Sequence, residues 1–200
     1  MGSINLKHTG SGSAIALSSD GTSLLLNGTA IGGGGGDYVH ISTTDITSST
    51  ASVEFTLPTG YDRFEFIFDL YSAGRAHVYF QTSQDAGSNW LVNNYKISSQ
   101  NNSYSSSLTW TSATYSGVVM ADRAKYLTGS IKIHRASETS ATRFVSYTSG
   151  FDGASYSANL QNASGMSTAQ TARINKVKFL ASGSYTYSSG KISLYGIKDS

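Results

Sequence analysis

Apolar and polar residues alternate with a period of two along most of the chain beyond Asp37. The runs VEFTL (53–57), RFEFIFDL (63–70) and AHVYFQT (76–82) each place their large apolar residues on one side. This alternation is the pattern of a β-strand with one buried face, and turn residues separate the runs. We therefore predict an all-β chain whose residues 37–200 form an antiparallel, jelly-roll-like β-sandwich. Further runs of this kind are SIKIHR, TRFVSY, NKVKFLAS and GKISLYGI.

The same alternation predicts which side chains are buried. Phe64, Phe66 and Phe68 should face the interior, whereas Glu54 and Glu65 should face solvent. The chain has no cysteine, so disulfides cannot contribute to its stability. A single proline, 21 glycines and 13 tyrosines are a composition that favours strands and tight turns over helices.

Residues 1–31 form short apolar runs that alternate with turns. The dipeptides DG at 20–21 and NG at 27–28 are strong hairpin signals. Strands of about four residues are too short and too few to enclose a core alone, so we expect this segment to pack on copies of itself or on another protein. The expected attachment and oligomer contacts are Ile4, Leu6, Ile15, Leu17, Leu24, Leu25, Leu26 and Ile31.

Five consecutive glycines, residues 32–36, follow this segment. A packed element does not need five glycines, so the run predicts a flexible hinge. The expected organisation is an N-terminal attachment and trimerisation segment (1–31), a glycine linker (32–36) and an outer β-sandwich domain (37–200). A glycine loop within one continuous domain is the alternative.

The stretch SQDAGSNW (83–90) has the order S-x-D-x-G-x-x-W, which resembles the Asp-box of sialidases and other sugar-handling proteins. The resemblance implies that Ser83 and Asp85 bond to the backbone of a tight turn at Gly87, and that Trp90 packs beneath the turn. Asn89 stands where the pattern commonly has Thr. Sialidase-like propellers have several such boxes and this chain has one, so we interpret it as a structural turn.

We predict no catalytic residues, no metal site and no cofactor. Only three glutamates are present, and no second acid is placed by spacing to form the carboxylate pair of a glycosidase. The four histidines are scattered without the short spacings of a metal site. The GGGGG run lacks the Lys-Ser/Thr of a phosphate-binding loop. We therefore expect a protein that is not an enzyme.

The two parts of the chain differ in the sign of their charge. Residues 1–122 carry four Lys/Arg against nine Asp/Glu, a net charge of −5, and residues 123–200 carry ten against three, a net charge of +7. This asymmetry fits an anionic partner, contacts between neighbouring subunits, or opposite charges that meet across strands within one domain. No nucleic-acid motif accompanies the basic residues, so nucleic acid is not an expected partner. No run of about 18 apolar residues exists, so no membrane insertion is expected.

The segment KISSQNNSYSSSLTWTSATYS (96–116) is low in charge and contains three aromatic residues. We expect this segment to be a long loop that leads into a strand. Aromatic rings that stack on sugars and amides that orient them could bind a glycan here, whereas in the alternative Trp110 is a core residue. The candidate glycan-binding residues are Tyr104, Trp110, Tyr115, Asn101 and Asn102.

The leader INLKHTGSGSAIALSSDGTSLLLNGTAIGGGG resembles the leader segments of structural proteins of tailed bacteriophages, particularly marine and cyanobacterial phages. The runs YDRFEFIFDL, VYFQTSQDAGSNW, INKVKFLASG and GKISLYGIK are similar to those of the β-sandwich often attached to such leaders. The resemblance implies a non-enzymatic virion subunit of a fibre, spike or capsid decoration, assembled in the host cytoplasm. It also implies a homotrimer anchored to capsid or tail proteins by its N-terminus. A host-surface carbohydrate-binding module and, less favoured, a polysaccharide depolymerase are the alternatives.

Overall fold

The structure is a computed structural model of the whole chain, in which only strands, turns and extended segments occur among the described residues. All strand pairs are antiparallel, and the prediction of an all-β fold is confirmed. The chain divides into two compact units, residues 1–36 and 37–200. The described residues are 4–6, 15–19, 24–26, 29–30, 38–92, 95–102, 109–115, 118–140, 142–151, 158–167 and 170–198.

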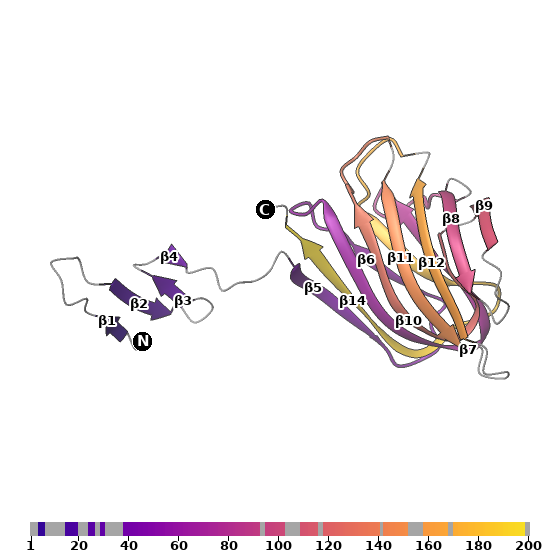
Figure 1. Cartoon of the computed structure of the whole chain (residues 1–200), viewed down its shortest axis with the longest axis horizontal. Coiled ribbons are helices and arrows are strands. Elements are labelled where there is room, and N and C mark those ends of the chain that lie inside the picture. The colour runs from indigo at the N-terminus through magenta and orange to yellow at the C-terminus, as the bar shows by residue number, and fades with distance from the viewer. Residues whose placement is uncertain are drawn as a thin grey trace. The chain divides into compact units, whose positions relative to one another are not determined.

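The first unit is a small sheet of four short strands that pair in chain order (Figure 1). Each strand is antiparallel to the next, as the hairpin signals DG and NG predict. The strands are β1 (Ile4–Leu6), β2 (Ile15–Ser19), β3 (Leu24–Leu26) and β4 (Thr29–Ala30).

The second unit is a larger sheet with the strand order β5-β14-β7-β10-β11-β12-β8-β9 (Figure 1). Off this path, β13 pairs with β7, and β6 pairs with β13. The strand β14 lies between β5 and β7 and pairs with both. The strands are β5 (Tyr38–Ile46), β6 (Ser52–Thr56), β7 (Arg63–Ser83), β8 (Tyr95–Asn102), β9 (Thr109–Tyr115), β10 (Val118–His134), β11 (Arg143–Phe151), β12 (Ala158–Ser167), β13 (Lys176–Ala181) and β14 (Tyr187–Ile197).

The strand β7 belongs to both layers of this unit. Its first half, residues 63–72, pairs with β14, and its second half, residues 78–83, pairs with β13. The second half therefore forms a smaller layer with β13 and β6 that packs against the larger one. The sequence suggested two separate strands in this region, and the structure joins them into one bent strand of 21 residues.

The bend in β7 is matched by irregularities in β10, its neighbour in both layers. The register between the two strands shifts three times between Val119 and Tyr126, and such bulges increase local twist and bend. On the other side of the bend, the Ala73 N–H donates to Thr186 O at 3.0 Å. At Gly74 a β-carbon would lie 2.3 Å from the ring of Tyr185, so a larger residue there would displace that half-exposed ring.

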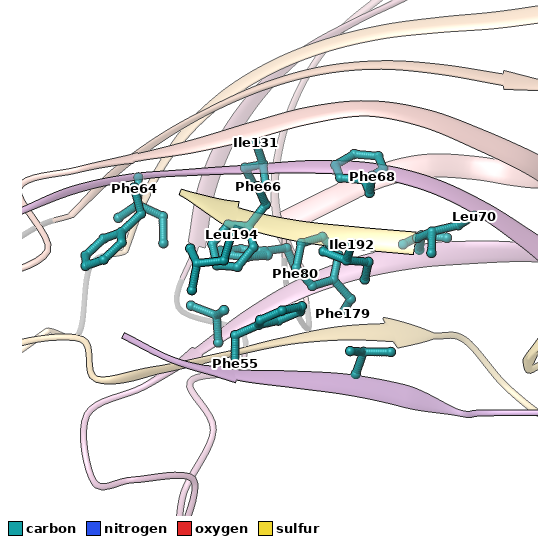
Figure 2. Packing of buried hydrophobic residues seen from close by; sticks show 14 of the residues in the cluster. Phe55, Phe64, Phe66, Phe68, Leu70, Phe80, Ile131, Phe179, Ile192 and Leu194 are labelled. Carbon is teal, nitrogen blue, oxygen red and sulfur yellow. The ribbon is translucent and has the colours of Figure 1, made fainter. Parts of the chain in front are cut away.

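Aromatic rings from both layers fill the core (Figure 2). The Phe179 ring on β13 contacts Phe66 and Phe80 with centroids 5.3 Å apart in each case, and both contacts are edge-on. Phe55 on β6 approaches Phe66 at 5.3 Å. Edge-to-face packing is the favoured geometry for aromatic rings, and these rings join the small layer to the large one.

Burial follows the alternation along the first half of β7 and along β6. Phe64, Phe66 and Phe68 are buried as predicted, and Glu54 is exposed. The prediction for Glu65 was wrong, because it is only 8% exposed. Lys132 on the neighbouring β10 lies 3.6 Å from the Glu65 carboxylate and covers it.

The segment 96–116 was also expected to be a loop, and this prediction was wrong. The chain forms β8 (Tyr95–Asn102) and β9 (Thr109–Tyr115) there, and they pair with each other at the end of the sheet order. Serine, threonine and asparagine dominate both strands, so their sequences lack the apolar alternation that marks β6 and β7.

Candidate functional site

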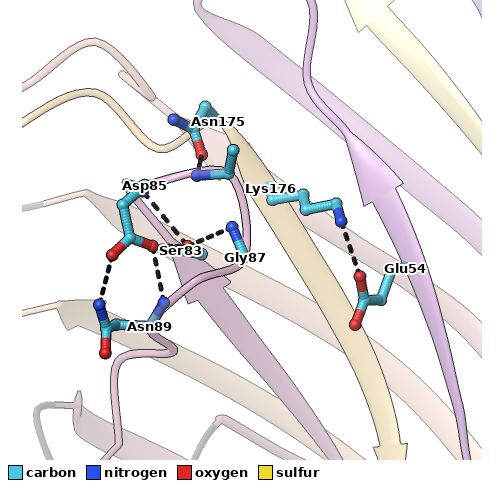
Figure 3. A network of polar contacts seen from close by, with 8 residues as sticks. Glu54, Ser83, Asp85, Gly87, Asn89, Asn175 and Lys176 are labelled. Carbon is cyan, nitrogen blue, oxygen red and sulfur yellow. Dashed lines mark hydrogen bonds and ion pairs between the residues drawn. The ribbon is translucent and has the colours of Figure 1, made fainter.

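The Asp-box-like turn is held by hydrogen bonds that converge on Ser83 and Asp85 (Figure 3). The Ser83 Oγ donates to Asp85 Oδ1 at 2.8 Å and accepts the Gly87 N–H at 3.0 Å. The Asp85 carboxylate also accepts two hydrogen bonds from Asn89, from its backbone N–H at 2.8 Å and from its Nδ2 at 2.7 Å. Asn89, which replaces the common threonine, thus supplies a second donor to the same carboxylate.

These donors hold the pKa of Asp85 well below its ordinary value. The hydrogen bonds from Asn89 and then from Ser83 stabilise the charged form and lower the pKa to about 2. The carboxylate is therefore ionised at neutral pH, and its hydrogen bonds all go to its own turn. A general acid needs the opposite shift, towards a raised pKa.

Asn175 fixes the turn from outside the motif (Figure 3). Its Oδ1 accepts the Ala86 N–H at 3.0 Å. Its Nδ2 donates to Gln84 O at 2.7 Å. Asn175 comes just before β13, far along the chain, so no local signal in the sequence could identify it.

Trp90 does not lie fully buried beneath the turn. It is half-buried, and the Lys178 ammonium on β13 lies 4.1 Å from the centre of its ring in a cation–π contact. The Trp90 ring also approaches the space beside Gly87, where a β-carbon would lie 3.5 Å from it. The turn is thus packed onto the outer surface of the small layer.

The register of the first unit places its aliphatic residues unequally on the two faces. Residues that pair directly share a face, and the pairs Ile4–Leu17, Leu17–Leu26 and Leu6–Ile15 continue across β1, β2 and β3. Leu25 is on the opposite face, where it pairs with Ser18 and Ala30. Ile31 lies outside the described residues. We call the first set the aliphatic face; its members are Ile4, Leu6, Ile15, Leu17, Leu24 and Leu26.

The glycan-binding candidates are not brought to one face of the sheet. Trp110 on β9 pairs with Gln100, while Tyr115 pairs with Tyr95, whose side chain is buried in the core. Trp110 and Tyr115 therefore occupy opposite faces. Asn102 shares the face of Trp110 and Asn101 does not, since they are consecutive in β8. Tyr104 lies outside the described residues.

The register instead aligns Trp110 with residues from seven other strands. Starting at β5, the pairs connect Thr43 with Ser193, Ser193 with Ile67, and Ile67 with Ser130. The line continues from Ser130 to Tyr147, Asn162, Gln100 and finally Trp110. We call this line the central row. It crosses the face of the large layer that is turned away from the core, and none of its residues is charged.

Ion pairs flank the central row on both sides. On one side of the central row, two residues along the strands, the Lys132 ammonium lies 3.6 Å from the Glu65 carboxylate. On the other side, the Lys191 ammonium lies 3.5 Å from the Asp45 carboxylate. The Tyr38 hydroxyl and then Glu65 raise the pKa of Lys132, so it stays charged.

Three of the ion pairs join the two parts of the chain that differ in the sign of their charge. Lys132, Lys191 and Lys176 come from the basic part of the chain, and they pair with Glu65, Asp45 and Glu54 of the acidic part. The interpretation that opposite charges meet across strands within one domain is confirmed for these pairs.

An open pocket of about 470 Å³ lies at one end of the second unit, where the loop before β7 meets the segment before β13. Its charged lining residues include Asp62 and Arg173. Asp62 accepts the Ser137 N–H at 2.7 Å, and Arg173 donates to the carbonyls of Pro58 and Tyr61. These contacts tie loops together, so the two charges have structural roles in the pocket wall.

Among the described residues, no three His, Asp or Glu side chains gather closely enough to bind a metal ion. The same part of the chain contains no helix long and apolar enough to cross a membrane. Comparisons of the chain with protein-family models, curated proteins and solved structures find no match in any of the three.

Proposed function

We propose that this chain is a non-enzymatic structural subunit of a bacteriophage virion, in which the N-terminal sheet attaches and trimerises the protein and the β-sandwich is displayed outward. The observation that carries the proposal is the aliphatic face of the first unit. A sheet with one apolar face must bury that face against a second layer. The described strands of residues 1–36 supply one layer only, and we propose that other polypeptides supply the covering layer.

The size of the first unit supports this reading. Its strands contain two to five residues, and isolated hairpins of that length are marginal in water. Burial of six aliphatic side chains at about 1.5–3 kcal/mol each would offset the cost of ordering such strands. Three copies around an axis provide that burial with one repeated contact.

The chemistry of the second unit supports a structural role for the sandwich. The Asp85 carboxylate is bound by its own turn, and Glu54, Glu65 and Asp45 are each within 4 Å of a lysine ammonium. Carboxylates engaged in this way stabilise the fold and are poorly placed to transfer protons.

The resemblance of the leader to those of tailed-phage structural proteins supports the virion assignment. In such a particle the trimer would link three outer domains to one anchor. Three weak contacts on one anchor gain avidity without a strong single site.

Light scattering on the full-length protein tests the proposal, with Leu26→Asp as the variant and Leu25→Asp as its matched control. The two leucines are adjacent but lie on opposite faces of β3. A carboxylate in an apolar interface is costly, so Leu26→Asp should weaken the trimer by about a hundredfold or more. Leu25→Asp should keep the mass of three chains at micromolar concentration.

Circular dichroism of both variants shows whether the sandwich is still folded. A wild-type mass of one chain at micromolar concentration would contradict the proposal. Equal loss of the trimer in both variants would contradict the role of the aliphatic face. Cross-linking from residues 4–31 in an intact particle then identifies the capsid or tail protein that receives the trimer.

A further inference from the structure

The central row contains the most exposed of the large hydrophobic side chains that the structure describes. Tyr147 is 54% exposed and Ile67, two strands away, is 49% exposed. Both lie in the middle strands of a sheet face, where neighbouring side chains usually cover such residues. No hydrogen bond or ring contact of Tyr147 is found among the described residues, and about half of its surface is open to solvent.

The immediate neighbours of Tyr147 in the row, Ser130 and Asn162, are polar. Ser130 precedes it on β10, and Asn162, Gln100 and Trp110 occupy the next positions on β12, β8 and β9. Strands lie about 4.8 Å apart, so Trp110 is placed about 14 Å from Tyr147 along the row. The row therefore has two aromatic positions with two amide positions between them.

Aromatic and amide groups arranged in this way match the surface of a sugar chain. A pyranose ring presents C–H groups on its faces, which stack on aromatic rings, and hydroxyls at its edge, which bond to amides and hydroxyls. A line of such positions across eight strands suits an extended ligand better than a compact one.

The charges beside the row select among extended ligands. A nucleic acid needs unpaired cations along its path, whereas Lys132 and Lys191 beside the row are each paired with a carboxylate. Asp69, which is exposed and pairs in register with Lys191, would repel an acidic polysaccharide. An uncharged row bordered by paired lysines and an exposed acid favours a neutral chain over an acidic one.

We infer that the central row is a binding surface for a neutral polysaccharide, with Tyr147 and Trp110 as the two aromatic positions. This inference goes beyond the structural role of the subunit and does not rest on its trimerisation. The inferred glycan site is therefore no longer confined to the segment 96–116. It extends across the large layer along the central row, which ends at Trp110.

Affinity electrophoresis of the full-length protein tests the inference. The probes are gels that contain dextran, mannan, xylan or galactan, and a gel with alginate serves as the acidic comparison. At least one neutral polysaccharide should retard the wild-type protein more than alginate does. Loss of one stacking position should weaken retention about tenfold in Tyr147→Ala and in Trp110→Ala, and Tyr147→Phe should retain binding because its ring remains.

Tyr126→Ala is the matched control, because Tyr126 is 48% exposed on the same face but lies four residues along the strand from the central row. It should bind like the wild-type protein, and thermal unfolding shows whether each variant is folded. No retardation by any neutral polysaccharide would overturn the inference, as would stronger retardation by alginate. Equal affinity of Tyr147→Ala and the wild-type protein would overturn the role of the row.

Discussion

The ring of Phe66 lies 5.8 Å from the ring of Phe80, although both residues belong to the single strand β7. A straight strand would hold these two residues about 46 Å apart. The strand therefore turns back on itself, and its two halves face each other across the core. One segment of chain supplies both layers of the sandwich, so the fold depends on the bend at residues 73–77.

Gly74→Ala should destabilise the bend, because a β-carbon there would lie 2.3 Å from the Tyr185 ring and displace it. Since Tyr185 is 41% exposed and can move into solvent, the cost should be about 1 kcal/mol, the low end for overpacking, and the urea midpoint of unfolding should fall by a corresponding amount. Gly60→Ala is the matched control, since nothing lies within 4 Å of its β-carbon position. Equal midpoints for the two variants would show that the bend does not need a glycine.

Two buried tyrosines should respond oppositely to loss of the hydroxyl. The Tyr187 hydroxyl is buried and has no hydrogen-bond partner among the described residues, whereas the Tyr95 hydroxyl bonds to the Thr82 N–H at 2.8 Å and to Thr82 Oγ1 at 3.0 Å. Tyr95→Phe should destabilise the protein by about 1–2 kcal/mol. Tyr187→Phe should be neutral or stabilise it by about 1 kcal/mol.

Urea unfolding of both phenylalanine variants at neutral pH measures the difference. Because each variant removes one oxygen from a buried ring, the packing of the two sites changes little. A loss of stability in Tyr187→Phe that equals the loss in Tyr95→Phe would contradict the difference in hydrogen bonding.

The turn at Ser83 should contribute a pH-dependent part of the stability. The pKa of Asp85 is about 2 in the folded protein and 3.8 when unperturbed. A lowered pKa stabilises the folded state above the unfolded pKa, and this contribution is lost as the pH falls from about 4 towards 2. The urea midpoint of the wild-type protein should therefore fall more between pH 7 and pH 2.5 than the midpoint of Asp85→Asn.

The same experiment separates this carboxylate from the others, because both proteins share every other acid. Asn89→Ala removes one of the two Asn89 donors and should give an intermediate response. Identical falls for the wild-type protein and Asp85→Asn would show that the turn does not hold the carboxylate in its ionised form.

The period-two pattern was enough to predict the all-β fold and the inward positions of Phe64, Phe66 and Phe68, because each strand with one buried face carries the pattern locally. It failed at Glu65, since Lys132 on another strand covers that residue. It also failed at β8 and β9, whose polar residues pair at the end of the sheet order without an apolar stripe. The jelly-roll-like connection stays a prediction.

For the candidate surfaces too, contacts between neighbouring residues could be predicted from the sequence, whereas contacts between distant strands could not. The sequence predicted the turn from Ser83 to Asn89, because the contacts within it are local. It did not predict that Asn175, which is distant in the sequence, donates and accepts hydrogen bonds at this turn. The central row joins eight strands by register, and no sequence spacing reveals which residues share a row. The sequence marked Trp110 as a candidate, because it lies in a segment rich in aromatic and amide residues, whereas no local pattern distinguished Tyr147.

The accessibility of position 26 tests the central claim most directly, namely that other chains cover the aliphatic face. The chain has no cysteine, so Leu26→Cys and Leu25→Cys each carry one thiol, on opposite faces of β3. In the proposed trimer, Leu26→Cys should react with a maleimide at least about tenfold more slowly than Leu25→Cys, and dilution to single chains should remove that protection. Protection of Leu26→Cys that persists in a protein with the mass of one chain would contradict the account.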